Sequence, residues 1–116
     1  MKNLIKSFEM LTAFAAACPQ GFTIDSQTFA PIKSGYAVAV ADTQNSFGNA
    51  GAARVVAYAA KHDNINALGG WFNSDNNQYY FEAVVIFEEQ TAANEFARLN
   101  NQIAYFDLTN GKEIIL

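Results

Sequence analysis

Residues 78–87 read QYYFEAVVIF, and the alternation of side chains in this stretch decides the fold that we expect. The odd-numbered positions are all apolar, as on the buried face of a strand whose side chains point alternately to two sides. The even-numbered positions are mixed, so we expect that face to be partly exposed. The all-polar stretch 73–77 (NSDNN) is turn-prone and separates this strand from an apolar segment at 65–72. The two segments predict a β-hairpin.

Gly69 and Gly70 lie inside the first arm of this hairpin. Glycines within a strand are typical of a bulge, or of a place where another group packs close to the backbone. Both interpretations stay open at this point.

Further strands lie on both sides of the hairpin in the sequence. The uncharged stretch 35–41 (GYAVAVA) predicts a strand in the sheet centre. Asn110-Gly111 is the strongest short hairpin signal, because both central residues of such a turn take positive φ, and it predicts a second hairpin. Its arms are expected at 103–108 and 113–116. Residues 22–24 predict a short strand, and 29–32 an edge strand or irregular segment, since proline cannot donate to a ladder.

Apolar residues at helical spacing predict three helices, at 4–17, 50–61 and 91–100. In the third helix we expect Ala92, Phe96 and Leu99 to be buried and Thr91 to cap the first turn. Strands that are separated by helices yet joined in tight hairpins favour an α+β fold. The sequence therefore predicts one domain over residues 1–116, with a mixed, mainly antiparallel sheet packed with about three helices.

The composition excludes several classes of protein. The chain has 116 residues, of which 51% are apolar and 16% charged, with a formal charge of −4. This apolar content excludes disorder, and the acidic balance excludes a basic nucleic-acid binder of the usual kind. No segment approaches the ~20 apolar residues that span a bilayer. The segment from Met1 to Cys18 superficially resembles a signal peptide, but Ser7 and Glu9 interrupt its apolar part, so we expect an amphipathic helix and a cytoplasmic protein.

Residues that carry chemistry are few. A catalytic zinc site needs about three ligands, and the chain has one histidine, His62, and one cysteine, Cys18. Phosphate-binding loops and serine nucleophile elbows are missing. Glu88 and Glu89 are adjacent, so their carboxylates point apart rather than forming a dyad. We expect no catalytic residue, no metal and no cofactor, with Cys18 as a structural side chain and His62 as a solvated helix end.

Two features predict a binding surface. The loop residues Gln44, Asn45, Ser46 and Phe47 are dense in amides and hydroxyls, which form hydrogen bonds flexibly. The hairpin is rich in aromatic residues, which are common at protein interfaces. The alternatives are that the loop only caps its own helix and that the aromatics are core. The candidate partner-binding residues are Gln44, Asn45, Ser46, Phe47, Trp71, Tyr79, Tyr80 and Glu82.

Five segments together resemble a group of small uncharacterised modules from phages and other bacterial mobile elements. They are GYAV (35–38), TQNSFG (43–48), GGWF (69–72), YYF (79–81) and NQIAYFDL (101–108). The resemblance implies an inhibitor of host defence, similar to anti-CRISPR proteins, that acts by occupying a surface of a host protein or nucleoprotein complex. No functional residue is carried over from the group.

We therefore expect a non-enzymatic binding protein that contacts neither membrane nor nucleic acid directly. One alternative is a small enzyme that uses Asp42, Gln44, Asn45 and Ser46 beside a pocket. A pocket lined by a carboxyl group with a raised pKa would favour it. Another is an oligomerising module or homodimer in which an edge strand, at 103–108 or 113–116, pairs with a second copy.

Overall fold

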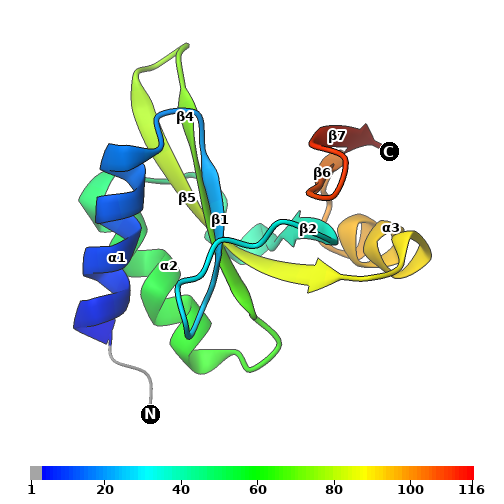
Figure 1. Ribbon diagram of the computed structural model, residues 1–116, viewed down its shortest axis with the longest axis horizontal. Helices are drawn as coiled ribbons and strands as arrows, with labels where there is room; N and C mark the ends of the chain where they lie inside the picture. Colours follow the sequence, from blue (N-terminus) through cyan, green and yellow to red (C-terminus); the bar gives the residue numbers. More distant parts are fainter. Residues whose placement is uncertain (1–3) are drawn as a thin grey trace.

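The computed structural model describes residues 4–116, and the expected long hairpin lies at the centre of its sheet (Figure 1). β4 (Ala67–Asn73) and β5 (Gln78–Phe87) pair in unbroken antiparallel register from Ala67↔Val84 to Asn73↔Gln78. In the connecting loop, the Asn73 side chain accepts a hydrogen bond from the Asp75 N–H, and the Asn76 side chain accepts one from the Gln78 N–H. The polar stretch therefore closes the turn through its amide side chains, as asparagine-rich turns do.

The other strands extend the sheet on both sides of this hairpin in the order β1-β4-β5-β2-β6-β7. Every pairing among the described strands is antiparallel. β2 lies between β5 and β6, as the uncharged stretch 35–41 predicts. The two-residue strand β3 pairs with β5 beside the hairpin end. The bounds are β1 (Phe22–Asp25), β2 (Tyr36–Ala39), β3 (Ser46–Phe47), β6 (Ala104–Asp107) and β7 (Lys112–Ile115).

In the described part of the chain, three helices cover one face of the sheet: α1 (Leu4–Ala17), α2 (Gly48–Lys61) and α3 (Gln90–Leu99). α1 and α2 lie together against β4 and β5, whereas α3 lies apart from them beside β2 (Figure 1). The odd-numbered positions of β5 form this face. Phe81, Ala83 and Val85 are buried in the same core as Leu11 of α1 and Val55 of α2. The expected α+β class and the core face of β5 are confirmed.

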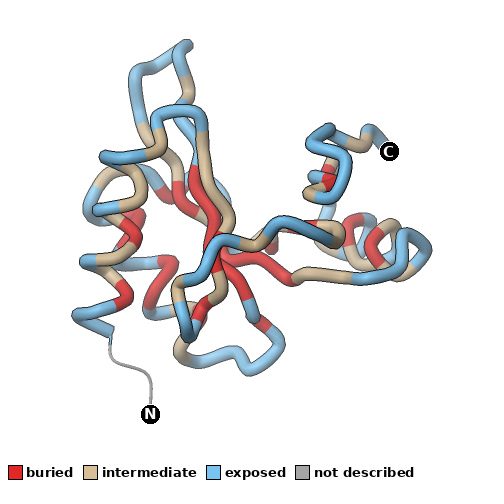
Figure 2. Tube along the Cα trace, in the orientation of Figure 1, coloured by how far each residue is buried: buried red, intermediate tan, exposed pale blue. Residues whose placement is uncertain are grey.

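Within residues 4–116, the opposite face of the sheet carries no helix. Towards its centre, Ala37, Ala67 and Val84 form a small buried cluster beneath Ile32 and Leu108. Towards the hairpin tip the cover ends, and Figure 2 shows exposed chain there. This uncovered region carries the even-numbered side chains at the hairpin end of β5, which include Tyr80 and Glu82.

The structure decides between the two interpretations of Gly69 and Gly70, and it contradicts the expectations for Thr91 and Leu99. The hairpin has no bulge at Gly69 and Gly70, so close packing is the correct interpretation: a Cβ on Gly70 would lie 2.6 Å from the Phe22 ring. Thr91 does not cap α3, because the helix begins at Gln90 and the N-cap position is Glu89. Leu99 is 77% exposed instead of buried. Ala93 and Ala97 are buried in its place, because small side chains let α3 approach β2 closely.

The C-terminal hairpin forms with a longer turn than the Asn-Gly pair predicts. Asp107 pairs with Lys112, which leaves four residues in the loop, and Gly111 alone of the Asn-Gly pair has positive φ. The Asp107 carboxylate accepts hydrogen bonds from the backbone and side-chain N–H groups of Asn110. β6 is paired on both sides, so an edge at 103–108 is wrong, whereas β7 is an edge strand.

The N-terminal helix forms as expected from residue 4. Met1–Asn3, which the signal-peptide alternative includes, lie outside the described residues. Over residues 4–116, none of the helices combines the length and the apolar character that crossing a membrane requires.

Candidate functional site

The loop that leads into α2 is held by one arginine. After β2 the chain forms a short 3₁₀ helix (Ala41–Thr43) and then β3. The Arg54 guanidinium donates to the backbone oxygens of Asp42 and Gln44, at 2.6 Å and 2.9 Å, and to the Ser46 Oγ at 3.0 Å. Charge-assisted hydrogen bonds of this kind are stronger than neutral ones, so α2 fixes the path of the loop.

Two hydroxyl groups anchor the same loop, that of Thr43 to the sheet and that of Ser46 to α2. Thr43 is buried, and its Oγ1 accepts a hydrogen bond from the Ala83 N–H of β5 and donates one to the Val40 oxygen. Ser46 is also buried, with its Oγ engaged by Arg54. Gly51 lets α2 pack this closely, because a Cβ there would lie 2.2 Å from the Ser46 carbonyl carbon.

The side chains between these anchors are exposed. Gln44 and Asn45 point outward from the held backbone, and Asn45 adopts φ of 61°, in the left-handed region that asparagine tolerates. The loop thus does more than cap its own helix: it presents two amide side chains on a fixed backbone.

Three aromatic rings form a cluster beside this loop. Trp71 of β4 stacks on Tyr80 of β5 with ring centroids 5.1 Å apart and planes 19° apart. Phe47 of β3 tilts against the other side of Tyr80 at 5.4 Å. The Tyr80 hydroxyl accepts a hydrogen bond from the Asn76 side chain at 2.7 Å. Phe47 and Trp71 remain 45% and 43% exposed, so this cluster is rigid and accessible rather than core.

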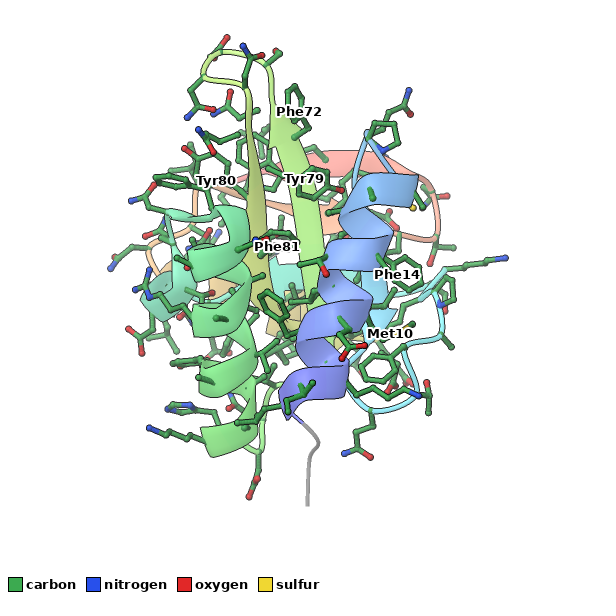
Figure 3. All side chains as sticks on the ribbon, turned by 90° about the vertical axis from the view of Figure 1, so that its left-hand side faces the viewer. Met10, Phe14, Phe72, Tyr79, Tyr80 and Phe81 are labelled. Atoms are coloured by element: carbon green, nitrogen blue, oxygen red, sulfur yellow. The ribbon has the colours of Figure 1, made fainter. Side chains whose placement is uncertain are left out.

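Tyr79 belongs to the other face of the hairpin. In Figure 3 it lies on the side of α1, whereas Tyr80 lies away from that helix. Its ring packs near Phe22, and its hydroxyl donates to the Cys18 oxygen at 2.7 Å. Burial raises the pKa of Tyr79 to about 12. This side chain joins α1 to the sheet and is separate from the Trp71–Tyr80 stack.

A cavity of about 270 Å³ opens between the held loop and the Trp71–Tyr80 stack. We call it the Glu82 cavity, because Glu82 is the sole carboxyl group among its lining residues. It is bounded by Ala39, Val40, Thr43, Gln44, Asn45, Trp71, Asn73, Tyr80, Phe81, Glu82 and Gln102.

Glu82 lies flat across β4. A Cβ on Gly69, its partner in the ladder, would lie 3.3 Å from the Glu82 Cγ and 3.4 Å from its Oε1. Gly69 thus makes the space that this side chain occupies. Burial raises the pKa of Glu82 from its ordinary value of 4.5 to about 7. Desolvation is the cause, because a low-dielectric environment disfavours the charged carboxylate.

Five of the eight candidate binding residues meet in this cavity: Gln44, Asn45, Trp71, Tyr80 and Glu82. Phe47 adjoins it through its contact with Tyr80. Ser46 supports the loop from beneath, and Tyr79 faces α1. Sequence reasoning missed Asn73 and Gln102, which reach the cavity from the hairpin end and from the α3–β6 connection. The sequence marks Gly69 as a glycine within a strand, but no local pattern connects it with Glu82.

Other candidate groups for chemistry lie apart from the cavity lining. The Asp42 carboxylate accepts a hydrogen bond from Tyr58 of α2, and the His62 ring stacks on the Tyr58 ring at the end of that helix. Cys18 is a free, partly exposed thiol after α1. Glu88 and Glu89 are exposed beside the start of α3. Within residues 4–116, no group of three or more His, Cys, Asp and Glu residues is placed to hold a metal ion.

A scan of family models and searches of curated proteins and solved structures found no match to this chain.

Proposed function

We propose that this chain is a non-enzymatic binding protein that recognises a partner protein through the Trp71–Tyr80–Phe47 cluster and the rim of the Glu82 cavity. The observation that carries the proposal is that Phe47 and Trp71 are almost half exposed although contacts with the Tyr80 ring already hold them in place. Rigid aromatic side chains lose little conformational entropy on binding, and they dominate the energetics of protein interfaces.

The surroundings of the cluster suit an interface as well. Gln44 and Asn45 offer donors and acceptors at the edge of the aromatic surface, on a backbone that Arg54 holds. An apolar centre with a polar rim is the usual anatomy of a protein interface. The hairpin tip, beyond the end of α1 in Figure 1, leaves this surface accessible to a large partner.

The class of partner comes from the sequence resemblance to modules of phages and mobile elements. We propose a cytoplasmic host defence protein or nucleoprotein complex, which the chain inhibits by occupying a surface. The net charge of −4 favours contact with a basic protein surface over direct contact with nucleic acid.

The experiment compares capture of a partner by wild-type chain and by W71A, with L99A as the matched control. Leu99 is exposed on α3 and lies outside the cavity lining. We expect wild type and L99A to retain one stoichiometric partner from a bacterial host and to weaken interference against a phage, and W71A to lose both effects. Equal capture by W71A, or no stoichiometric partner together with no effect on interference, would contradict the proposal.

One observation favours a second candidate, a small enzyme. A carboxyl group with raised pKa inside a cavity is a feature of general acid–base catalysis, and Glu82 is such a group. The residues first considered for this role are otherwise engaged, since Asp42 and Ser46 are hydrogen-bonded to Tyr58 and Arg54. An enzyme would therefore depend on Glu82, and turnover of any substrate that E82Q abolishes would identify it.

An oligomerising role depends on β7, the edge strand. Edge strands expose unpaired backbone groups that a second copy can use. Light scattering over a range of concentrations tests this role, and a strict monomer at high concentration would exclude it.

A further inference from the structure

We propose that the Glu82 cavity binds an organic cation, an alkylammonium or guanidinium group, and that its source is a lysine or arginine side chain of the partner protein. The cation site is a property of this chain alone, whereas the source of the cation rests on the proposed function.

The first argument is charge without a counterion. Of the described residues that line the cavity, Glu82 is the one with a charged side chain, and Tyr80 is the one other titratable group. Over residues 4–116, the Glu82 carboxylate makes no hydrogen bond and no ion pair. The nearby guanidinium of Arg54 is committed to the loop backbone and to Ser46. The carboxylate is partly buried, so a cation that enters the cavity would compensate for the solvation that the carboxylate has lost.

The second argument is the aromatic wall. Trp71 and Tyr80 line the same cavity as the carboxylate and are fixed against each other at 5.1 Å. The faces of such rings attract ammonium and guanidinium ions, and tryptophan does so best. A carboxylate beside two aromatic rings is selective for cations that also carry apolar surface, because the rings contact the alkyl stem or the guanidinium plane.

The third argument is the remaining polar lining. Four residues with amide side chains are among those that line the cavity: Gln44, Asn45, Asn73 and Gln102. Amide oxygens are suitable acceptors for the several N–H groups of an ammonium or guanidinium ion, although the Asn73 oxygen already accepts one hydrogen bond from the Asp75 N–H. Among the described residues, no basic side chain lines the cavity to repel such a ligand.

The size of the cavity indicates what fits. Its volume of about 270 Å³ lies below the range of roughly 300–1,000 Å³ that is usual for drug-sized ligands. One long basic side chain fits a space of this size. The raised pKa of Glu82 agrees with this assignment, because a bound cation would restore the stability of the carboxylate that burial removes.

The chain carries its own reporter for the test. Trp71 is the only tryptophan, so intrinsic fluorescence reports directly on the cavity wall. The titrants are blocked arginine (N-acetyl-arginine methylamide) and its neutral isostere, the blocked citrulline, at about pH 8, where the Glu82 carboxylate is mostly ionised. We expect saturable binding of the arginine compound with Kd of about 1 mM, and binding of citrulline weaker by about tenfold or more.

Two variants assign the binding to Glu82. E82Q removes the charge at constant shape, and we expect it to lose about tenfold in affinity for blocked arginine. E113Q makes the same charge change on the exposed edge strand β7 and is expected to bind as wild type does. G69A keeps the charge but crowds the Glu82 side chain, so it also weakens binding. Thermal unfolding verifies that each variant is folded. Equal binding of arginine and citrulline, or unchanged binding by E82Q, would overturn the cation site.

Partner capture separates this inference from the proposed function. Capture that W71A abolishes and E82Q weakens supports both. If blocked arginine binds and the partner is captured equally by wild type and E82Q, the partner is not the source of the cation. If W71A abolishes capture but blocked arginine does not bind to wild type, the proposed function stands and the cation site fails.

Discussion

Replacing Glu82 by glutamine is expected to stabilise the fold at alkaline pH, and the amount follows from the desolvation of this carboxyl group. Its pKa rises from 4.5 to about 7 in the folded chain. Each pKa unit corresponds to about 1.4 kcal/mol, so full desolvation would cost about 3 kcal/mol of stability when the group is ionised. The cavity keeps some contact with water, which lowers the expected gain for E82Q to about 1–3 kcal/mol.

The sign of the pH dependence follows from proton uptake. Between pH 4.5 and about 7 the folded chain binds more protons at Glu82 than the unfolded chain does. The contribution of this group to stability is therefore fully present below pH 4.5 and is lost as pH rises through about 7. Glutamine resembles the protonated acid at every pH. Wild type and E82Q should consequently be about equally stable at low pH and diverge as pH rises.

Urea unfolding followed by Trp71 fluorescence measures this difference. Urea is preferable to guanidinium chloride, because guanidinium belongs to the class of ligand proposed for the cavity. The free energies of unfolding of wild type and E82Q are compared at about pH 4.5 and again at about pH 8. Because the other titrating groups contribute equally to both proteins, their contributions cancel in each comparison, and E113Q controls for the loss of a negative charge. A stability difference that does not change with pH, or an E82Q that is less stable than wild type at the higher pH, would refute the reasoning.

Three other substitutions test the framework of the site and the C-terminal hairpin. G51A should lower the free energy of unfolding in urea by about 1–3 kcal/mol, because the new Cβ would lie 2.2 Å from the Ser46 carbonyl carbon. An unchanged free energy of unfolding would mean that α2 and β3 are further apart. Replacing Arg54 by methionine should lower stability by about 1–3 kcal/mol and reduce partner capture, and capture at the wild-type level would show that the held loop does not contribute. Hydrogen bonds from the Asn110 side chain and then its backbone lower the pKa of Asp107, so this carboxylate contributes stability that is lost as pH falls below about 4. D107N should therefore show a weaker loss of stability on acidification than wild type, and identical acid unfolding curves would contradict the assignment.

The sequence predicts the parts of this fold that repeat a local pattern. The alternation at 78–87 identifies both the hairpin and its core face, because a period of two has one structural meaning. β3 could not be predicted, since two residues are too short to show a period. The prediction that Leu99 lies on the buried side of α3 is wrong. A large apolar residue is ordinarily the better candidate for burial, but α3 approaches β2 so closely that the small residues Ala93 and Ala97 are buried instead.

The candidate site is also predictable from the sequence only in part. Composition alone pointed to Trp71, Tyr80 and the loop amides, since exposed aromatics and amides share a tendency to form interfaces. The cavity itself depends on which strands are neighbours. Gln102 follows α3 and Gly69 lies in β4, yet both contribute to the surroundings of Glu82. Long-range pairing of this kind is absent from any local pattern.

The way Arg54 holds the loop has an evolutionary consequence. Two of its three hydrogen bonds end on backbone oxygens, at Asp42 and Gln44, and these atoms are present whatever the side chains are. Position 44 can thus accept almost any residue without altering the course of the chain. Fewer residue types are suitable at position 45, because its φ of 61° favours asparagine, aspartate or glycine. Under the proposed function, descendants of this protein could therefore change their partner by exchanging one outward side chain while the backbone of the loop stays the same.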